Sequence, residues 1–294
     1  MSRLYSKRLL RGMLFPLLVM WLSSCATNPA PDAAGPRATD APYPILLSDD
    51  EGTRHANALA AWTNLTHSMG IANAPAPELQ PVTATVRSLP SLEATPLYLP
   101  KVGEALPMNE EETRESLRRF IVETGPLLCG GELQQLSLVQ RVDGANGVKE
   151  ARYQQRPFRY GLRGGYGVLS ISFTPDRRIV QMTSTCVPDI ERLRRSFIAL
   201  AQQRMSSDKA IESIAGRAVT YTDASGNQQS VTLPEKEKLN ARELVIYPIA
   251  RGGEPPLLEF HVAWELFTTA APGLTIYLDS VTGDVLGTEQ KQSS

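Results

Sequence analysis

The chain has 294 residues, of which 42% are hydrophobic and 21% are charged, a composition typical of a globular protein with one large or two small domains. Its net charge of −1 gives no excess of positive charge for the phosphates of nucleic acid, so we expect no nucleic-acid partner. Beyond the N-terminus no apolar run approaches the roughly 20 residues that cross a bilayer as a helix.

The N-terminus combines basic residues, an apolar stretch and a cysteine. Arg3, Lys7, Arg8 and Arg11 precede the apolar residues 13–22, and Leu22-Ser23-Ser24-Cys25 follows. Ten apolar residues are too few to cross roughly 30 Å of hydrocarbon, which argues against an uncleaved membrane anchor. The pattern resembles the signal peptide and lipobox of bacterial lipoproteins. That resemblance implies removal of residues 1–24, lipidation of Cys25, and, because Ala26 follows, a place in the cell envelope at the periplasmic face of the outer membrane.

Residues 25–43 are rich in proline and alanine and poor in large apolar side chains. Such a segment cannot bury enough surface to fold, so we expect a disordered tether. Residues 44–110 are predicted to hold one helix and an extended region. Ser48, followed by three acidic residues, is the expected helix start, and the helix is expected to end near Met69. The proline-rich residues 74–107 are expected to cross the surface as extended chain.

The residues from 111 to 190 read as a helix followed by strands. Asn109 and Glu112 have the spacing of a capping box, and Gly125-Pro126 is the expected helix end. Strands with alternating apolar residues are then expected within 136–140, 151–155, 168–173 and 179–186, with a hairpin turn at 174–177 between the last two.

The residues from 191 to 294 repeat the same order. A helix starting at Asp189 and a shorter one at Ser207 precede expected strands at 244–249, 257–266 and 274–279, and a turn at 279–284 leads to a final strand. Helices followed by adjacent strands, twice over, predict an α+β fold with antiparallel sheets.

Four segments of the last third resemble the PepSY domain, which occurs in propeptides of thermolysin-type metalloproteases and as a separate envelope module. They are Ser207-Asp208-Lys209-Ala210-Ile211, Glu243-Leu244-Val245-Ile246-Tyr247-Pro248, Val262-Ala263-Trp264-Glu265-Leu266 and the hairpin from Ile276 to Leu286. Residues 111–190 more weakly resemble the companion module of those propeptides: Arg152-Tyr153-Gln154-Gln155 fits, but Arg159 stands where glycine is expected. The resemblance implies two modules, at 111–190 and 191–294, with antiparallel sheets wrapped on helices.

No catalytic constellation is present in the sequence. The only histidines are His55, His67 and His261, which cannot form the His-Glu-x-x-His pair of a zinc protease, and there is no Gly-x-Ser-x-Gly elbow. The glycines between Gly161 and Gly167 precede a strand and not a helix, so a turn or bulge is expected there in preference to a phosphate site. We therefore expect no enzyme activity, cofactor, metal or small-molecule substrate.

Cys129 and Cys186 are the only cysteines besides Cys25. Because an exported chain meets an oxidising environment, we expect them to form a disulfide, with two unpaired buried thiols as the alternative.

Two groups of residues are the candidate partner-binding sites. The first surrounds the glycine-rich turn and suits an acidic or aromatic partner: Arg156, Arg159, Tyr160, Arg163 and Tyr166. The second is the basic run Arg192, Arg194 and Arg195 on the helix after residue 189, for which a solvated helix face is the plainer interpretation. Trp62 and Trp264 fall on apolar faces and are expected in the core.

The function that the resemblances imply is that of a lipid-anchored envelope protein that binds another protein without chemistry of its own. By analogy with the propeptides, the partner is expected to be a secreted metalloprotease that the chain inhibits or chaperones through a sheet edge or its C-terminal tail. The alternative is a structural or assembly lipoprotein that docks other envelope proteins.

Overall fold

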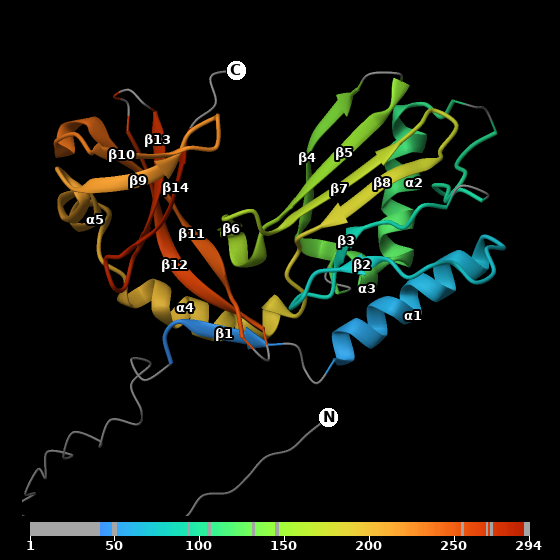
Figure 1. The fold of residues 1–294 in the computed structure, drawn as a ribbon, viewed down its shortest axis with the longest axis horizontal. Helices are drawn as coiled ribbons and strands as arrows, with labels where there is room; N and C mark the ends of the chain where they lie inside the picture. The colour runs from blue at the N-terminus through green and yellow to red at the C-terminus, as the bar shows by residue number, and fades with distance from the viewer. Residues whose placement is uncertain are drawn as a thin grey trace, which may run out of the picture. The chain divides into compact units, whose positions relative to one another are not determined.

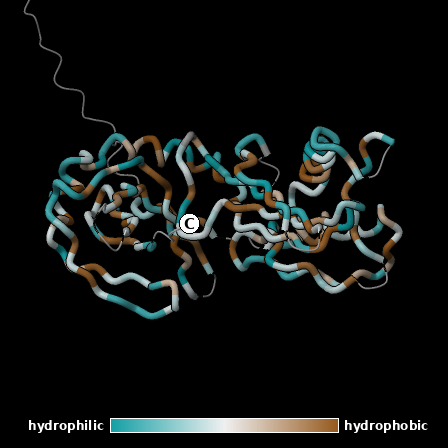
Figure 2. The backbone as a smooth tube through the Cα atoms, turned by 90° about the horizontal axis from the view of Figure 1, so that it is seen from above, coloured by the Kyte–Doolittle hydropathy of each residue, from teal (hydrophilic) through white to brown (hydrophobic). Residues whose placement is uncertain are grey.

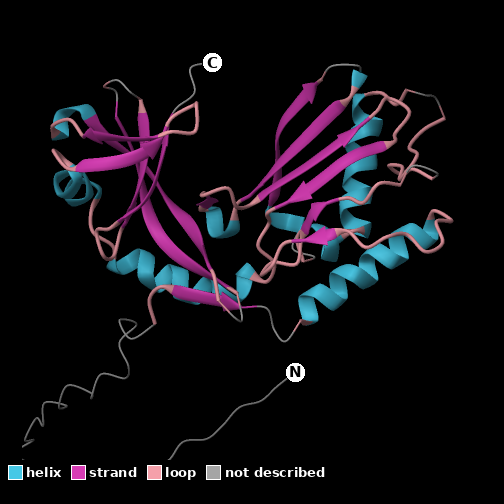
Figure 3. Ribbon diagram, in the orientation of Figure 1, coloured by secondary structure: helices cyan, strands magenta, loops and turns pink. Residues whose placement is uncertain are grey.

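A computed structural model describes residues 42–48, 52–92, 95–104, 107–130, 133–144, 147–253, 256–268, 270 and 273–290. The described residues form one compact unit. The predicted signal peptide, Cys25 and the tether up to residue 41 lie outside the described residues, as do residues 291–294. The described part has the mixed α+β class, with helices and several antiparallel sheets (Figures 1 and 3).

The first sheet is a four-stranded antiparallel sheet in the order β4-β5-β7-β8. Its strands are Leu136–Asp143, Lys149–Gln155, Val168–Phe173 and Ile179–Ser184, close to the predicted ranges. β7 and β8 form the expected hairpin around residues 174–177. Alternation of buried and half-buried residues along β7 gives the sheet one face for a core.

Three helices cover the apolar face of this sheet. They are α2 (Glu110–Glu123), which lies behind the sheet in Figure 1, α3 (Gly125–Leu128), and α1 (Thr53–Ser68), which contacts α3 and contributes to the same core. Trp62 of α1 and Phe120 of α2 share one apolar core with Leu169 and Ile171 of the sheet. The predicted capping box is confirmed, because Asn109 and Glu112 exchange side chain to main chain hydrogen bonds of 2.9 Å. α2 ends at Glu123, just before Gly125-Pro126, as predicted. The short helix α3 follows, with Pro126 in its first turn, where no main-chain donor is needed.

The proline-rich stretch after α1 differs from the prediction. It contains the short strands β2 (Glu78–Leu79) and β3 (Val86–Ser88), and Val82, Val86 and Leu97 are buried. β3 contacts β8. The main-chain N–H of Ile179 in β8 donates to Leu97, and the main-chain N–H of Leu99 donates to Arg177 in the turn before β8. The stretch is therefore part of the core and covers the β8 edge of the first sheet.

The second sheet has the strand order β14-β13-β12-β11-β6. β11 (Leu239–Arg251), β12 (Leu257–Thr268), β13 (Leu274–Asp279) and β14 (Val285–Gln290) are consecutive antiparallel strands, as predicted, while β6 (Gly161–Leu162) runs parallel to β11. β14 includes Thr288 to Gln290, so the described end of the chain is built into the sheet and is not a free tail.

The predicted helix after residue 189 is a 3₁₀ turn, Ile190–Leu193, followed by α4 (Arg194–Gln203). α5 (Ser207–Ile214) follows and is capped by the side chain of Ser206, one residue earlier than expected. The hairpin of β9 (Ala218–Thr222) and β10 (Gln228–Thr232) was not predicted. Asp223 starts its turn by accepting hydrogen bonds from the main chain of Ser225 and Asn227.

An unpredicted strand, β1 (Ile45–Ser48), pairs with the first half of β12. Ser48 therefore ends a strand, and the residue before α1 is Gly52. Ile45 and Leu47 are buried beside Leu258 and Phe260, which explains why this segment pairs although its sequence is short. Both β1 and β6 join the second sheet, so that sheet includes residues from all three predicted regions between 44 and 294.

The predicted disulfide between Cys129 and Cys186 is absent. Cys129 follows α3 and Cys186 follows β8, and both are 0% exposed in the same apolar core, but they are not bonded to each other. Trp62 is buried and Trp264 half-buried, as predicted for core residues. In Figure 2 hydrophobic and hydrophilic residues alternate over short distances along the tube. Among the described residues, no helix is long and apolar enough to cross a membrane.

Candidate partner-binding site

Arg163, the centre of the first predicted binding group, is committed to contacts inside the protein. Its Nε atom lies 2.7 Å from Glu265 Oε2, and its Nη2 atom lies 2.9 Å from Glu243 Oε1. Burial lowers the pKa of Arg163, but the two carboxylates outweigh this effect and raise it above its ordinary value. Arg163 therefore joins the turn after β6 to strands β11 and β12, and it is not available to grip a partner.

The other members of this group lie around the same turn. Arg156 is half exposed and reaches Glu243 at 3.4 Å. Tyr160 and Tyr166 pack against the core beside β1 and α4, while the side chain of Arg159 lies outside the described residues. Gly164 and Gly167 have positive φ angles of 63° and 77°, so the predicted turn is confirmed and needs glycine there.

The second predicted group, Arg192, Arg194 and Arg195, is exposed on the 3₁₀ turn and α4. Arg194 is nevertheless engaged, because its guanidinium lies 5.3 Å from the centre of the Phe158 ring and its Nε atom lies 2.9 Å from Glu191. The structure brings the two predicted groups near each other through this Arg194–Phe158 contact. It does not merge them into one pocket.

The open edge formed by strand β4 is the feature that the sequence prediction missed. β4 lies at the edge of the first sheet, and no other described strand pairs with its outer side. All its residues after Leu136 are exposed, including Val139 at 57% and Val142 at 41%. The opposite edge, β8, is covered by β3 and by the chain around Leu97 and Leu99. One sheet edge is therefore closed and the other is open, with apolar side chains along it.

A groove of about 450 Å³ runs between β4 and helix α2. Its apolar lining comes from Ile121 and Val122 of α2 and from Leu136, Leu138 and Tyr153 of the sheet. Burial raises the pKa of Tyr153 to about 12, so the Tyr153 side chain that lines the groove is neutral at physiological pH. An apolar groove that continues an open sheet edge offers side-chain pockets beside unpaired main-chain groups.

The rim of the groove carries an excess of positive charge. Arg114 and Arg118 line the groove, and Arg119 and Arg141 share carboxylates with them. Within the described part of the chain, these four arginines form ion pairs with two carboxylates, Glu110 and Glu115. Hydrogen bonds from Arg118 and Arg119 lower the pKa of Glu115 to about 2, so that carboxylate stays ionised. The net charge of these six groups favours an occupant with acidic residues.

A third cluster contains Tyr43, near the start of the described residues. Tyr43 donates a hydrogen bond of 2.6 Å to Asp279, and Nδ1 of His261 lies 2.8 Å from the same carboxylate oxygen. Burial alone would raise the pKa of Asp279, but hydrogen bonds from His261, Tyr43 and the main chain of Val281 and Thr282 together lower it below its ordinary value. The ionised carboxylate makes Nδ1 the donor. Nε2 of His261 is buried without a hydrogen-bond partner among the described residues.

No group of three or more His, Cys, Asp or Glu side chains in the described ranges could hold a metal ion. Comparison of the sequence with protein-family models found no match. A search of curated protein sequences found no significant match either.

Proposed function

We propose that this chain is a lipid-anchored envelope protein that binds another protein through the open edge strand β4. The single observation that carries the proposal is the combination of an unpaired strand edge, exposed Val139 and Val142, and an apolar groove beside them. Natural sheets normally shorten, charge or cover such edges because they pair with other chains. An edge left open beside a groove suits a partner segment that adds as a further strand.

The class of partner follows from the sequence resemblance. The motifs shared with metalloprotease propeptides fall on α5 and on the consecutive strands β11 to β14, which supports a PepSY-like module in this part of the chain. We therefore infer that the partner is a secreted metalloprotease, inhibited or chaperoned by this protein. The predicted lipid on Cys25 would keep the complex at the envelope surface.

The test is capture with the full chain purified in detergent, applied to solubilised envelope and culture supernatant, with bound proteins identified by mass spectrometry. The wild-type protein is expected to enrich a metalloprotease and to slow its cleavage of casein. Replacement of both edge valines, Val139→Lys and Val142→Lys, places charge on the apolar edge and is expected to lower recovery about tenfold.

Val180→Lys is the matched control, because Val180 is a similarly exposed valine on the covered edge strand β8. It should bind like the wild type. Equal recovery by the β4 double variant and the wild type would show that this edge is not the binding site.

A second candidate function is docking of envelope assembly proteins through Arg192, Arg194 and Arg195. The observation that favours it is the exposure of all three arginines on one short stretch. Under this alternative, replacing the three arginines with glutamine abolishes recovery of envelope proteins, the β4 variant binds normally, and casein cleavage is unaffected.

A further inference from the structure

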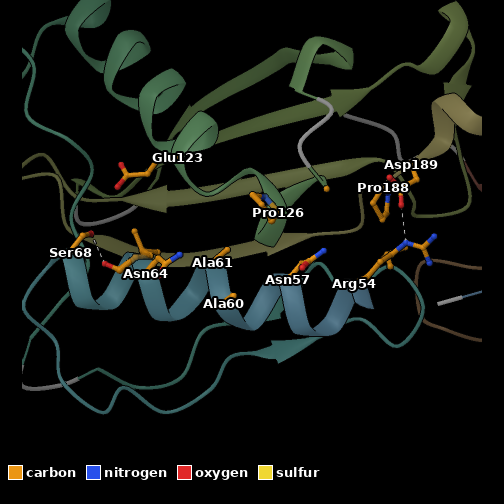
Figure 4. A pocket seen from close by; sticks show the side chains of 13 residues that line it. Arg54, Asn57, Ala60, Ala61, Asn64, Ser68, Glu123, Pro126, Pro188 and Asp189 are labelled. Atoms are coloured by element: carbon orange, nitrogen blue, oxygen red, sulfur yellow. Dashed lines mark hydrogen bonds and ion pairs between the residues drawn. The ribbon is translucent and has the colours of Figure 1, made fainter. Parts of the chain in front are cut away.

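A second groove, of about 550 Å³, lies between helix α1 and the segments that follow α2 and β8. One wall is α1, and the other includes Pro126, Gly130 and Pro188 (Figure 4). None of the residues that line it also lines the groove beside β4. It is therefore a separate surface from the proposed edge site.

The side chains that α1 contributes to this wall are short, and several are polar. Asn57, Ala60, Asn64 and Ser68 are exposed along it, three or four residues apart, and so they share one side of the helix. The alanines project no further than a methyl group, so another chain can approach the helix closely. Figure 4 shows the two asparagine side chains rising from α1 on the side of the groove.

Neither asparagine amide makes a hydrogen bond to any other described side chain or main-chain group in the structure. Asn57 and Asn64 are seven residues apart, which is about 10.5 Å along a helix and almost two complete turns. A polyproline II chain has three residues per turn and a rise of about 3.1 Å, so equivalent main-chain groups recur every 9.3 Å or so. The two amides are thus spaced to bind successive turns of such a chain. A β-strand repeats on one side at about 6.7 Å and fits this spacing less well.

The charged groups of the groove lie at its two ends. At one end Arg54 and Asp189 form an ion pair, with 3.2 Å between Nε and Oδ2. At the other end lies Glu123, near Ser68 in Figure 4, which makes no ion pair with the described residues. Because the Arg54–Asp189 pair is neutral, Glu123 is the one carboxylate among the described lining residues without an ion-pair partner. A basic side chain is its complement.

From these observations we propose that the α1 groove binds an extended peptide segment in the polyproline II conformation that carries a basic side chain. The side-chain N–H groups of Asn57 and Asn64 each donate a hydrogen bond to a main-chain carbonyl of the segment. Glu123 forms an ion pair with the basic side chain. Main-chain groups of a polyproline II segment are free to accept these bonds because the conformation has no internal hydrogen bonds. This site is additional to the β4 edge and does not depend on it.

The test measures binding of a fluorescein-labelled nonapeptide, Pro-Ala-Pro-Ala-Arg-Ala-Pro-Ala-Pro, to the full chain in detergent by fluorescence anisotropy. A second peptide has Glu in place of Arg. The wild type is expected to bind the Arg peptide about fivefold or more tightly than the Glu peptide. Asn57→Ala and Asn64→Ala are each expected to weaken binding of the Arg peptide about fivefold. Glu123→Gln should remove the preference between the two peptides.

Thr63→Ala is the matched control, because Thr63 is exposed on α1 but does not line the groove. Alanine favours helix, so all three α1 variants should retain the wild-type melting temperature. The proposal is overturned if the Arg peptide does not bind, or if it binds equally to the wild type and to both asparagine variants. The Val139→Lys and Val142→Lys protein should still bind the peptide, so failure here and failure of the proposed edge function are distinguishable.

Discussion

Asp279 is a buried carboxylate that stays ionised because two neighbours donate to it. Tyr43 comes from the start of the folded chain and His261 from the middle of β12, so the carboxylate joins segments that are 236 residues apart in sequence. The same residue also starts the turn before β14, since Oδ1 accepts hydrogen bonds from the main chain of Val281 and Thr282. The Asp279 side chain thus stabilises both the turn before β14 and the position of Tyr43.

Replacing this carboxylate tests its contribution to stability. Asp279→Asn is expected to lower the free energy of unfolding by about 2 kcal/mol at pH 7, because hydrogen bonds to a charged group are lost. The folded pKa is below the unfolded value, so the contribution is complete above pH 5 or so. It is lost as the pH falls through the folded pKa. Urea unfolding of both proteins between pH 7 and pH 3 should therefore show a converging difference. A constant difference would contradict the assignment.

The buried thiols provide a second test at single residues. Because Cys129 and Cys186 are fully buried and not bonded to each other, neither should react with maleimide in the folded protein. Both should react after unfolding without a reductant, as mass spectrometry of the labelled chain would show. If labelling of the unfolded chain requires a reductant, the cysteines are paired and the sequence prediction was right.

Among the elements, β1 shows how a segment of only four residues forms a strand because it pairs with β12. Ile45 and Leu47 fill the core beside Leu258 and Phe260, whereas Leu46 between them is exposed. β1 pairs with the part of the β12 edge that β13 leaves uncovered, since β13 pairs only with Ala263 to Phe267.

This alternation gives a matched pair of variants on one strand. Leu47→Ala is expected to lower the free energy of unfolding by about 2–3 kcal/mol because a buried side chain is removed. Leu46→Ala, at a site that is 57% exposed, is expected to change it by less than about 0.5 kcal/mol. Chemical denaturation of the two proteins measures the difference. Equal effects would mean that β1 is not docked on β12 in solution.

The elements also show what the sequence could predict. The capping box of α2, the β7–β8 hairpin and the strands β11 to β13 all depend on local patterns, and those predictions are confirmed. The sequence does not predict β1, because a run of four residues is too short to indicate a strand. Ile45 and Leu47 are buried because the segment pairs with β12. The prolines in residues 74–107 predict surface chain, because they interrupt the apolar pattern and do not reveal that Val86 is buried.

The candidate site was harder to predict for the same reason. Leu136 and Leu138 correctly indicated a strand, but the open edge depends on which strands pair, and no local pattern records that. Arg163 is predicted as a binding residue because it lies in the glycine-rich turn between Gly161 and Gly167. Its partners Glu243 and Glu265 are 80 and 102 residues away, so their ion pairs were invisible in the sequence.

For the whole molecule, lipidation of Cys25, if it occurs as predicted, would determine where the proposed binding surfaces operate. Cys25 lies outside the described residues, so lipidation stays a prediction. Cys25→Ser is expected to block lipidation and to move the protein from the membrane fraction to the soluble fraction. Cell fractionation and the mass of the mature N-terminus measure this. Retention of the Cys25→Ser protein in membranes would mean that another part of the chain anchors it.

The position of β1 has a mechanical consequence. A pull on the chain from its N-terminal side reaches Tyr43 and the four residue pairs of β1 before any other contact of the described fold. Peeling this segment away as far as α1 would release about ten residues, or some 30 Å of additional reach. It would also uncover β12 from Leu257 to Phe260, so that tension on the anchor would convert a paired strand edge into an accessible one.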